Sequence, residues 1–489
     1  MKKGETIPMK IEKFALGGQG LAFHEYEKQL EGPGSAGKTE KRRIPVFIDD
    51  VCVGDEANVR LTKKKNSFAE GRAIKITQPS PDRIAPRCKH FGVCGGCTWQ
   101  FLSYEKQLAW KKQLVRETLN HIGGFSEEVL GQVFRDVCGC DDPWFYRNKM
   151  EWSFSIGLDG VFSGGFHMRK MHYDTVKVEE CFLQSNVSVN IFKKVRDYLE
   201  GLHRAGVGVS YNSKTHRGLV HSVYVREGKR TGEYMVIVQT TPEEFDTEAF
   251  LAVLSEFPEI VSVVRVIVHE QKGTPKRWEE VILKGEHFYR EELWMSDAHG
   301  EKLVLKFQIK PQAFFQPNTM MAERIYGQVL QLLQESFSSD ALREMRAYDL
   351  YCGTGTIGIV LSHAVKSVMG VELNASAVES AKENAILNNV RNIEFFVGDV
   401  KKVLDELESS RAADIIVVDP PRSGLEEKVV EHIIRAAPKA ILYVSCNPAT
   451  FSRDAKIFAS QGYTLTFVRA FDQFPHTAHI ETVALLKRQ

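Results

Sequence analysis

Strand-like and helix-like segments alternate from about Phe314 to the C-terminus. A helix is predicted first, at 318–336, from its apolar spacing. The apolar runs that follow are typical of buried strands, and they are AYDLY, SVMGVE, IEFFVGD, DIIVVD, AILYVSC, YTLTFVRAF and TVALLK. Parallel strands need a crossover, usually a helix. We therefore predict a doubly wound, Rossmann-like α/β domain over 316–489, with ligands beyond the carboxyl ends of its strands.

The residues upstream have a different pattern. Short strand-like runs separated by Gly, Pro and Asp turns predict a small β-barrel over 8–77. The proline-rich stretch at 77–87 marks the first domain boundary, and a helix is predicted at 103–121, which could pack on the C-terminal domain. Strand patterns resembling antiparallel pairs, with one helix near 186–202, then predict a mixed, β-rich central domain within 78–315.

Composition excludes several classes of protein. No apolar stretch approaches the roughly 20 residues of a membrane helix, and the N-terminus has no apolar core typical of a secretory signal, so we expect a cytoplasmic protein with no membrane partner. Nine cysteines then require another explanation than disulfides. The net charge is only +1, but basic runs at 41–43, 63–65 and 111–112 could contact phosphate or could be ordinary solvated lysines.

A glycine-rich turn follows the first strand of the C-terminal domain. The sequence DLYCGTGTIG begins with Asp349 and contains Gly353 and Gly355, and Glu372 ends the next strand 19 positions after Gly353. Such an acid can accept hydrogen bonds from ribose hydroxyls, so NAD is one alternative. The pattern D-x-x-x-G-x-G, without a third glycine in the pyrophosphate spacing, favours S-adenosylmethionine. Asp399, after the third strand, could contact adenine or cap the next helix.

An acid and a thiol end two neighbouring strands. Asp419 begins DPPR, which continues to Arg422, and Cys446 precedes an Asn-Pro helix start that could increase the thiolate fraction. Carbon 5 of uracil becomes nucleophilic only after a thiolate adds to carbon 6, and a base must later remove the carbon 5 proton. Glu481, just before the last strand, is the candidate base. The alternative for Cys446 is an inert thiol in the core.

A cysteine cluster precedes the predicted helix at 103–121. Cys88, Cys94 and Cys97 lie in CKHFGVCGGCTWQ, which predicts a metal site that needs one further ligand. From the residues alone, zinc and an iron–sulfur cluster both stay open, although zinc sites more often have two close pairs of ligands.

Five motifs in this order resemble the RNA 5-methyluridine (uracil-C5) methyltransferases, and the match covers nearly the whole chain: FFQPN, DLYCGTGTIG, DPPRSG, SCNP and HTAHIE. The resemblance implies that S-adenosylmethionine is surrounded by Gln316, Tyr351, Glu372 and Asp419. It assigns the nucleophile to Cys446 and the proton acceptor to Glu481. The expected intermediate is a covalent bond between the cysteine sulfur and uracil carbon 6.

The resemblance also extends to the N-terminal half. Residues 8–77 resemble a TRAM domain, an RNA-binding β-barrel. In the family, C-x5-C-G-G-C and a distant cysteine hold a [4Fe–4S] cluster, which implies Cys88, Cys94, Cys97 and, in VEECFLQ, Cys181. The segment PWFYRNKMEWSF resembles a central motif whose aromatic and cationic groups could hold an extruded base, although core packing explains its aromatics equally well.

The expected function is therefore methylation of uridine carbon 5 in structured RNA. The barrel and cysteine cluster favour 23S ribosomal RNA, as family analogy only. Three alternatives remain: a transfer-RNA T-loop uridine methyltransferase, an amino-group methyltransferase on nucleic acid, and a non-catalytic RNA-binding iron–sulfur protein.

Overall fold

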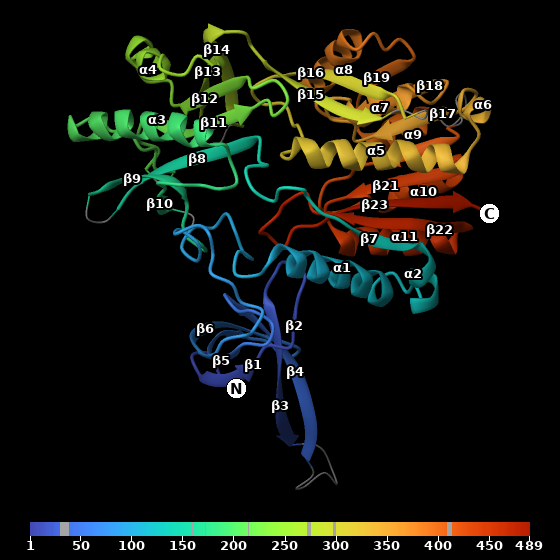
Figure 1. Ribbon diagram of the computed structural model, residues 1–489, viewed down its shortest axis with the longest axis horizontal. Coiled ribbons are helices and arrows are strands. Elements are labelled where there is room, and N and C mark those ends of the chain that lie inside the picture. The colour runs from blue at the N-terminus through green and yellow to red at the C-terminus, as the bar shows by residue number, and fades with distance from the viewer. Residues whose placement is uncertain are drawn as a thin grey trace. The chain divides into compact units, whose positions relative to one another are not determined.

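A computed structural model describes the chain at 1–29, 39–157, 160–171, 173–213, 215–270, 275–296, 300–407 and 413–489. These residues form two compact units, whose elements are labelled in Figure 1. The first unit contains Met1–Gly92, Gly96–Val115 and Phe474–His479, and the second contains Val93–Gly95, Arg116–Gln473 and Ile480–Gln489. The second unit therefore includes both the central segment and the C-terminal α/β segment predicted from the sequence.

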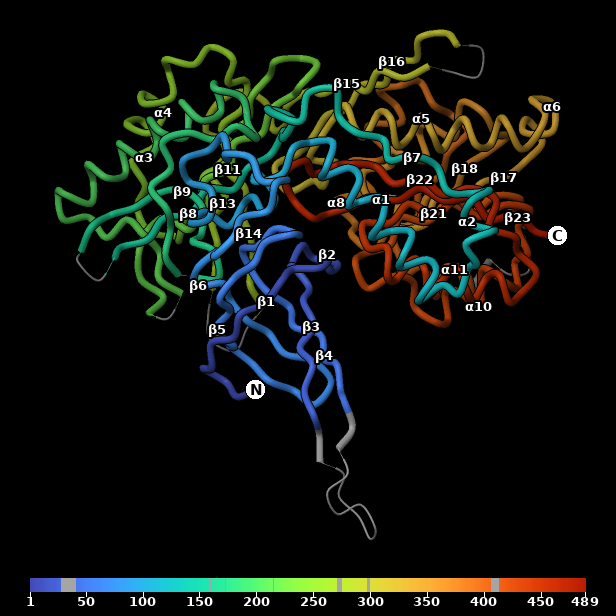
Figure 2. The backbone as a smooth tube through the Cα atoms, turned by 60° about the horizontal axis from the view of Figure 1, so that its bottom comes forward, coloured from blue at the N-terminus to red at the C-terminus, as the bar shows by residue number. Residues whose placement is uncertain are grey.

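The first unit is built on a six-stranded sheet in the order β1-β5-β6-β4-β3-β2. Its strands are β1 (Thr6–Lys10), β2 (Lys13–Phe14), β3 (Gly20–Gln29), β4 (Thr39–Asp49), β5 (Glu56–Lys64) and β6 (Ala69–Gln78). Figure 2 shows β3 and β4 side by side as a long antiparallel ribbon. The two outermost strands, β1 and β2, are separated only by Ile11 and Glu12, so one chain segment forms both edges of the sheet.

One of the basic runs has a structural role in this unit. Helix α1 (Tyr104–His121) has its first residues in the first unit and its last six in the second. The side chain of Lys111, on this helix, is completely buried, and its ammonium group donates a hydrogen bond to the carbonyl of Phe474 at 3.1 Å. The interpretation of the pair at 111–112 as phosphate contacts or solvated lysines is therefore wrong for Lys111. A buried cation needs such an acceptor because it has lost its hydration.

The second unit contains a seven-stranded central sheet in the order β10-β9-β8-β11-β12-β13-β14. Its strands are β8 (Lys149–Ile156), β9 (Phe162–His167), β10 (Thr175–Lys177), β11 (Val220–Glu227), β12 (Tyr234–Thr240), β13 (Ile260–His269) and β14 (Arg277–Gly285). Helix α3 (Asn186–Arg204) confirms the predicted helix. One pair differs from the antiparallel expectation, because β12 and β13 are parallel and α4 (Thr247–Leu254) connects them.

The C-terminal α/β segment forms an eight-stranded sheet in the order β19-β18-β17-β20-β21-β23-β22-β7. Its strands are β7 (Phe134–Cys138), β17 (Arg346–Leu350), β18 (Ser367–Glu372), β19 (Ile393–Val397), β20 (Ile415–Val418), β21 (Ala440–Ser445), β22 (Tyr463–Phe471) and β23 (Glu481–Arg488). The five strands from β19 to β21 are parallel, and β23 is antiparallel to both neighbours. This confirms the predicted doubly wound sheet.

Helices cover this sheet between its strands (Figure 1). They are α5 (Thr319–Ser336), α6 (Ser339–Leu342), α7 (Thr356–Ser362), α8 (Ala375–Leu387), α9 (Val400–Leu407), α10 (Glu427–Ala436) and α11 (Pro448–Ser460). Helix α5 packs on α7, whereas α10 packs on α9 and α11. The hairpin β15 (Tyr289–Ser296) and β16 (Lys302–Ile309) packs on α5 and α8.

Strand β7 joins the α/β sheet from a distant part of the sequence. Short α2 (Glu127–Val133) leads into β7, which pairs parallel to β22 although it precedes the central sheet in sequence.

In the described residues, no helix is both long enough and apolar enough to span a membrane.

Trp152 gives a test of the central core. Its ring is fully buried and stacks on Phe166 and Phe192, with ring centroids 4.2 and 3.9 Å away. We expect Trp152→Ala to lower the free energy of unfolding by about 3–5 kcal/mol, measured by urea denaturation, because it opens a large cavity. Trp278→Ala is the matched control: its residue is 50% exposed, so a change within about 0.5 kcal/mol is expected. Equal losses in the two variants would contradict this interpretation.

Candidate active site

The predicted site residues of the α/β sheet meet at one edge. Asp419 follows β20 and Cys446 follows β21, which are parallel neighbours. Glu481 begins β23, and because β23 is antiparallel to β21, its first residues lie at the same edge, where Thr482 pairs with Ser445. The sheet thus brings an acid, a thiol and a second acid together from three strands.

The glycine-rich turn lies beyond β17, at the point where the strand order reverses, which is where doubly wound sheets bind ligands. Tyr351, Gly353 and Gly355 all have left-handed φ angles, of 66°, 52° and 79°. A Cβ at Gly355 would lie 2.7 Å from the Phe395 ring, so this turn accepts only glycine there. The carboxylate of Glu372 accepts a hydrogen bond from the Gly353 amide at 3.2 Å, which fixes the acid against the turn.

Asp349 lies beneath this turn. It is fully buried, and its Oδ2 accepts a hydrogen bond from the Gly358 amide at 2.7 Å. Its Oδ1 has no hydrogen-bond partner within the described part of the chain. Burial raises the pKa of Asp349 to about 7, the Gly358 hydrogen bond opposes this, and the charges of Asp419 and Glu372 add to it. The carboxyl group therefore ionises only at neutral pH or above.

Gln316 is held beside this region by a second amide. Its Oε1 accepts a hydrogen bond from Gln473 Nε2 at 3.0 Å, and both side chains are buried. Gln316 also lies close to the hydroxyl of Tyr326, on α5. Burial raises the pKa of Tyr326 well above its usual value, and the nearby charges of Asp419, Glu481 and Asp349 raise it further. Tyr326 is therefore the residue that lies near both the glycine-rich turn and the two strand-end acids.

Asp419, which is half-buried, and the buried Glu481 form an interacting pair of acids. Burial raises the pKa of Asp419 to about 7. Burial, followed by the charge of Asp419, raises the pKa of Glu481 well above its usual value, whereas Arg422 lowers it. Two adjacent acids with little solvent do not both ionise readily, so the pair holds a proton at neutral pH. Glu481 is thereby made a stronger base than an exposed glutamate.

Cys446 is half-buried, between the end of β21 and the start of α11. Its position before the helix N-cap Asn447 confirms the predicted geometry, but the expected gain in thiolate does not follow. Burial raises the pKa of Cys446 to about 11, and the charges of Glu481 and Asp419 contribute, while a hydrogen bond and the charge of Arg422 oppose them. The thiol is therefore protonated at neutral pH unless a neighbouring group takes its proton or a cation stabilises its anion.

A network of hydrogen bonds fixes the DPPR loop on α11. Asn447 Nδ2 donates to the Arg422 carbonyl at 2.9 Å. Asp454 is buried and accepts hydrogen bonds from Leu425 N, Tyr443 Oη and Arg453 Nε, at 3.0, 2.7 and 2.8 Å. The loop that carries Arg422 is thus attached to the helix that follows Cys446, which holds cation and sulfur in register.

The remaining predicted residues lie elsewhere. Asp399 caps α9, since its Oδ1 accepts from Lys401 N at 3.0 Å, which is the capping alternative. Cys88, Cys94, Cys97 and Cys181 are half-buried and outside disulfides. In the second unit, Cys94 forms a β-bridge with Met168. No group of three or more Cys, His, Asp or Glu that could hold a metal ion occurs among the described residues.

The chain is similar to known RNA methyltransferases. Residues 277–489 match the family model described as tRNA (Uracil-5-)-methyltransferase. An uncharacterized RNA methyltransferase of Caldanaerobacter subterraneus subsp. tengcongensis is 36% identical over the whole of both chains. Another, of Bacteroides thetaiotaomicron, is 34% identical over 91% of this chain and 97% of the relative. The chain belongs to the family of S-adenosylmethionine-dependent RNA (uracil-5-)-methyltransferases.

A solved structure resembles almost the whole chain. It is the crystal structure of Pyrococcus abyssi tRNA (uracil-54, C5)-methyltransferase in complex with S-adenosyl-L-homocysteine. The TM-score is 0.68 and the sequence identity 27%, over 98% of this chain and 100% of that one. The similarity extends through the segments before the α/β sheet.

The residues present fit the family's cofactor. The Gly353–Gly355 turn leaves room for a ligand beside its backbone, since a Cβ at Gly353 would meet no described atom within 4 Å. The Glu372 carboxylate at the end of β18 is placed for hydroxyl groups, and Asp349 Oδ1 and Gln473 Oε1 are buried acceptors with no partner among the described residues. Buried polar atoms without partners are rare and are typical of binding sites.

Sequence reasoning missed Tyr326 and Gln473. Tyr326 occupies an apolar-face position of an ordinary amphipathic helix, so nothing in the sequence distinguishes it from core residues. Gln473 did carry a signal, because the polar pair Asp472–Gln473 directly follows the apolar strand β22. This is the same pattern that identified Asp419 after β20.

Asp349 gives a test of the buried acids. Its pKa is raised in the folded state from an ordinary value near 3.8 to about 7, so the folded chain binds the proton more tightly than the unfolded chain. The free energy of unfolding should therefore fall as pH rises from about 4 to 7, by up to about 1.4 kcal/mol per pH unit from this group. Asp349→Asn should make the thermal unfolding midpoint vary less with pH between about 4 and 7. Asp340→Asn, whose carboxyl is 97% exposed, should not.

Proposed function

We propose that this chain methylates carbon 5 of a uridine in structured RNA through a covalent bond between Cys446 and uracil carbon 6. The observation that carries the proposal is the meeting of Cys446, Asp419 and Glu481 at one sheet edge, next to the glycine-rich turn. An amino-group methyltransferase would have no use for the thiol, and a binding module would have no use for two adjacent acids with raised pKa values.

Gln316, Tyr351, Glu372 and Asp419 are the residues that we propose hold S-adenosylmethionine, which supplies an electrophilic methyl group when bound. Glu372 is fixed against Gly353, and would accept hydrogen bonds from ribose hydroxyls. Tyr351 offers a half-buried ring at the turn, in a strained left-handed conformation. Gln316 and Asp419 both lie close to Tyr326, which supports a shared role at the methionine end of the cofactor.

Cys446 is the proposed nucleophile. Its sulfur adds to uracil carbon 6, which moves electron density to carbon 5 and makes that carbon able to accept a methyl group. Because the pKa of Cys446 is raised to about 11, the thiol has to lose its proton as it attacks. Cys446 is half-buried, so this proton passes to solvent while Arg422 stabilises negative charge on the sulfur, and the Asp419–Glu481 pair keeps an ionised carboxylate for the later step.

Glu481 is the proposed base of the second half of the reaction. After methylation, the proton on carbon 5 goes to the Glu481 carboxylate, and the electron pair of that C–H bond expels the Cys446 sulfur. The burial that raises the pKa of Glu481 favours this transfer, since a stronger base accepts the proton more readily. The enzyme is then restored with its thiol reprotonated.

The target RNA is proposed to be 23S ribosomal RNA, from the combination of an N-terminal β-domain and a cysteine cluster. The alternative is the T loop of transfer RNA, which is favoured by the likeness to the Pyrococcus abyssi enzyme over 98% of the chain. Both targets are structured RNAs with unpaired uridines, which proteins of this kind read by extruding bases.

We propose that the six-stranded sheet of the first unit is the RNA-binding TRAM barrel. Its two edge strands, β1 and β2, follow one another directly in the chain, which keeps the two edges near each other and supports a sheet that curls toward closure. Exposed cations lie on its strands, including Lys41, Arg42 and Arg43 on β4 and Lys63 on β5. Arg43 and Lys63 have ion-pair partners, Glu12 and Glu70, so they offer less net charge to phosphate than the sequence alone indicates.

We also propose that Cys88, Cys94, Cys97 and Cys181 ligate a [4Fe–4S] cluster. The support is the cysteine spacing together with four half-buried thiols outside disulfides. The segment around Cys94 is also fixed, because the Gly95 amide donates to the His167 carbonyl at 3.1 Å. A cluster there would have a structural rather than an electron-transfer role.

Anaerobic purification tests the cluster. Protein from cells supplied with iron should contain about four iron and four sulfide per chain and show broad absorbance near 400 nm, a feature of such clusters. Cys181→Ala should lose most of the iron, whereas Cys138→Ala, also half-buried, should keep it. Stoichiometric zinc instead of iron would contradict this assignment.

Covalent trapping tests the reaction. Wild-type protein with cofactor and RNA containing 5-fluorouridine should form an adduct that survives denaturation. Fluorine replaces the carbon 5 hydrogen, so the base has no proton to remove and the Cys446 sulfur cannot be released. Cys446→Ala should form none. Glu481→Gln should accumulate the methylated adduct on ordinary RNA and lose turnover by about 10²–10⁴-fold.

Cys138→Ala is the matched control and should behave as wild type. Adduct formation by Cys446→Ala would contradict the proposal. Running the assay on a 23S ribosomal RNA fragment and on transfer RNA identifies the target as the RNA that forms the adduct.

A further inference from the structure

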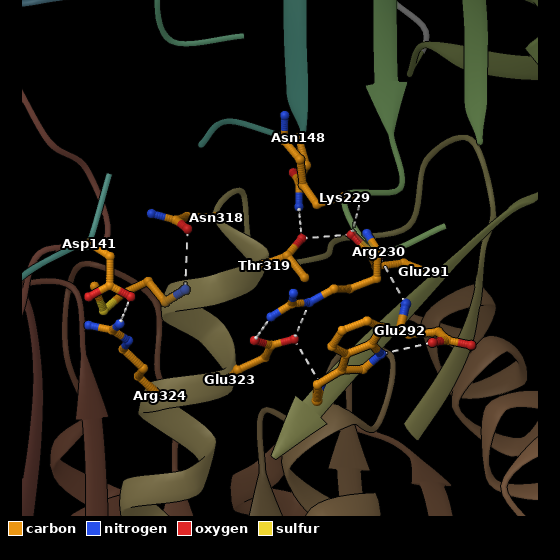
Figure 3. Close-up of polar contacts among 12 residues, drawn as sticks. Asp141, Asn148, Lys229, Arg230, Glu291, Glu292, Asn318, Thr319, Glu323 and Arg324 are labelled. Carbon is orange, nitrogen blue, oxygen red and sulfur yellow. Dashed lines mark hydrogen bonds and ion pairs between the residues drawn. The ribbon is translucent and has the colours of Figure 1, made fainter. Parts of the chain in front are cut away.

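We propose that Glu291 and Thr319 are positioning residues for the cofactor site, and that they place Gln316 through the amide of Asn148. This inference rests on the proposed role of Gln316. Neither residue is within the motifs that predicted the site, and Glu291 lies on β15, 25 positions before Gln316 in the sequence. Figure 3 shows the contacts of Thr319, at the start of α5, with Glu291 and Asn148.

Glu291 is a fully buried carboxylate that serves only as an acceptor. Oε2 accepts from Lys229 N and from Thr319 Oγ1, both at 2.7 Å, and Oε1 accepts from Arg230 N and Glu292 N, both at 2.9 Å. Three of the four donors are backbone amides, which cannot turn away or reverse their polarity. The carboxylate is therefore held in place, and the only mobile hydrogen that it fixes is that of Thr319.

The number of hydrogens on each side chain determines the direction of the remaining hydrogen bonds. A threonine hydroxyl has one hydrogen, and Thr319 gives it to Glu291, so Thr319 Oγ1 is an acceptor toward its other neighbour. Asn148 Nδ2 fills that place at 3.0 Å, and its second hydrogen goes to the Gln316 carbonyl at 2.8 Å. By accepting the Thr319 hydrogen, Glu291 determines which way the Asn148 amide faces, and this gives the Gln316 carbonyl its donor.

The result is that Gln316 is held at both ends. Asn148 binds its backbone carbonyl and Gln473 binds its side-chain oxygen at 3.0 Å. The Asn148 amide nitrogen of the main chain also donates to the Pro317 carbonyl at 2.9 Å. A side chain that must contact a ligand gains affinity when it is already in position, because less entropy is lost on binding.

A second contact to the same helix supplies the control. Arg230 forms a bidentate ion pair with Glu323, with distances of 2.9 and 2.6 Å, and Glu323 also accepts from Trp294 N at 2.7 Å. Glu323 is one turn after Thr319 on α5 and also faces β15 (Figure 3). It anchors the helix to the same strand, but it has no hydrogen bond to Asn148 or Gln316 among those of the described residues.

Four variants of the full chain test the inference. Thr319→Val keeps the shape of the side chain and removes the hydroxyl, and Thr319→Ser keeps the hydroxyl. Glu291→Gln keeps the shape of the side chain but replaces one carboxylate oxygen with an NH2 group. That group then faces backbone N–H donors, which cannot accept its hydrogens. Glu323→Gln weakens the control anchor. For each, the Kd for S-adenosylhomocysteine is measured by calorimetry without RNA, together with Tm and with the KM and kcat of methylation.

Thr319→Val and Glu291→Gln should raise both the Kd and the KM for cofactor about tenfold, as expected for a buried group left without its partner, while kcat changes less. Thr319→Ser should restore most of the affinity that Thr319→Val loses. Glu323→Gln should lower Tm and leave the Kd unchanged.

Three results would overturn the inference: unchanged affinity in folded Thr319→Val and Glu291→Gln, equal weakening by Thr319→Ser and Thr319→Val, or equal weakening by Glu323→Gln. Failure of the wild-type chain to bind S-adenosylhomocysteine would be a different result, because it would overturn the proposed function and this inference with it.

Discussion

Three acids with little access to solvent at one edge of the α/β sheet are the constraint around which this enzyme is arranged. Asp349 lies near the end of β17, Asp419 follows β20 and Glu481 begins β23, and each would be more stable ionised in water than here. A protein interior tolerates such groups when they are protonated or receive hydrogen bonds. Asp349 receives one from Gly358, and the Asp419–Glu481 pair can share a proton. The surrounding turn, loop and helix are therefore shaped by the need to satisfy these acids.

The same environment explains how a thiol with a raised pKa can be useful. Helix N-termini lower the pKa of cysteines in many enzymes, but at Cys446 burial and two acids have the larger effect. The resting site is thus close to neutral and its sulfur is protected from unwanted oxidation, since the thiolate is the reactive form. Arg422 is the described cation that opposes these effects, and the network from Asn447 to Asp454 keeps it in place.

The sequence was most informative where one local pattern determines both structure and position. Every predicted strand of the α/β sheet formed, and Asp419, Cys446 and Glu481 came together because the ends of neighbouring strands share an edge. Sequence patterns gave wrong predictions where packing between distant segments determines the structure. The parallel pairing of β12 with β13 depends on α4, which has only eight residues, and the burial of Lys111 depends on a carbonyl more than 360 positions away. Tyr326 and Glu291 are invisible in sequence because their partners are distant too.

The eighth strand has a consequence for how the polypeptide is made. β7 emerges from the ribosome early, yet its partner β22 begins at Tyr463, so the last edge of the sheet stays open until almost the whole chain has been synthesised. An unpaired strand edge is a template for aggregation, and contacts this far apart slow folding. During synthesis, each molecule therefore passes through a stage in which β7 has been made but β22, its partner, has not. A C-terminal fragment beginning at Gln316 would lack β7 and would expose the edge of β22 that β7 covers in the full chain.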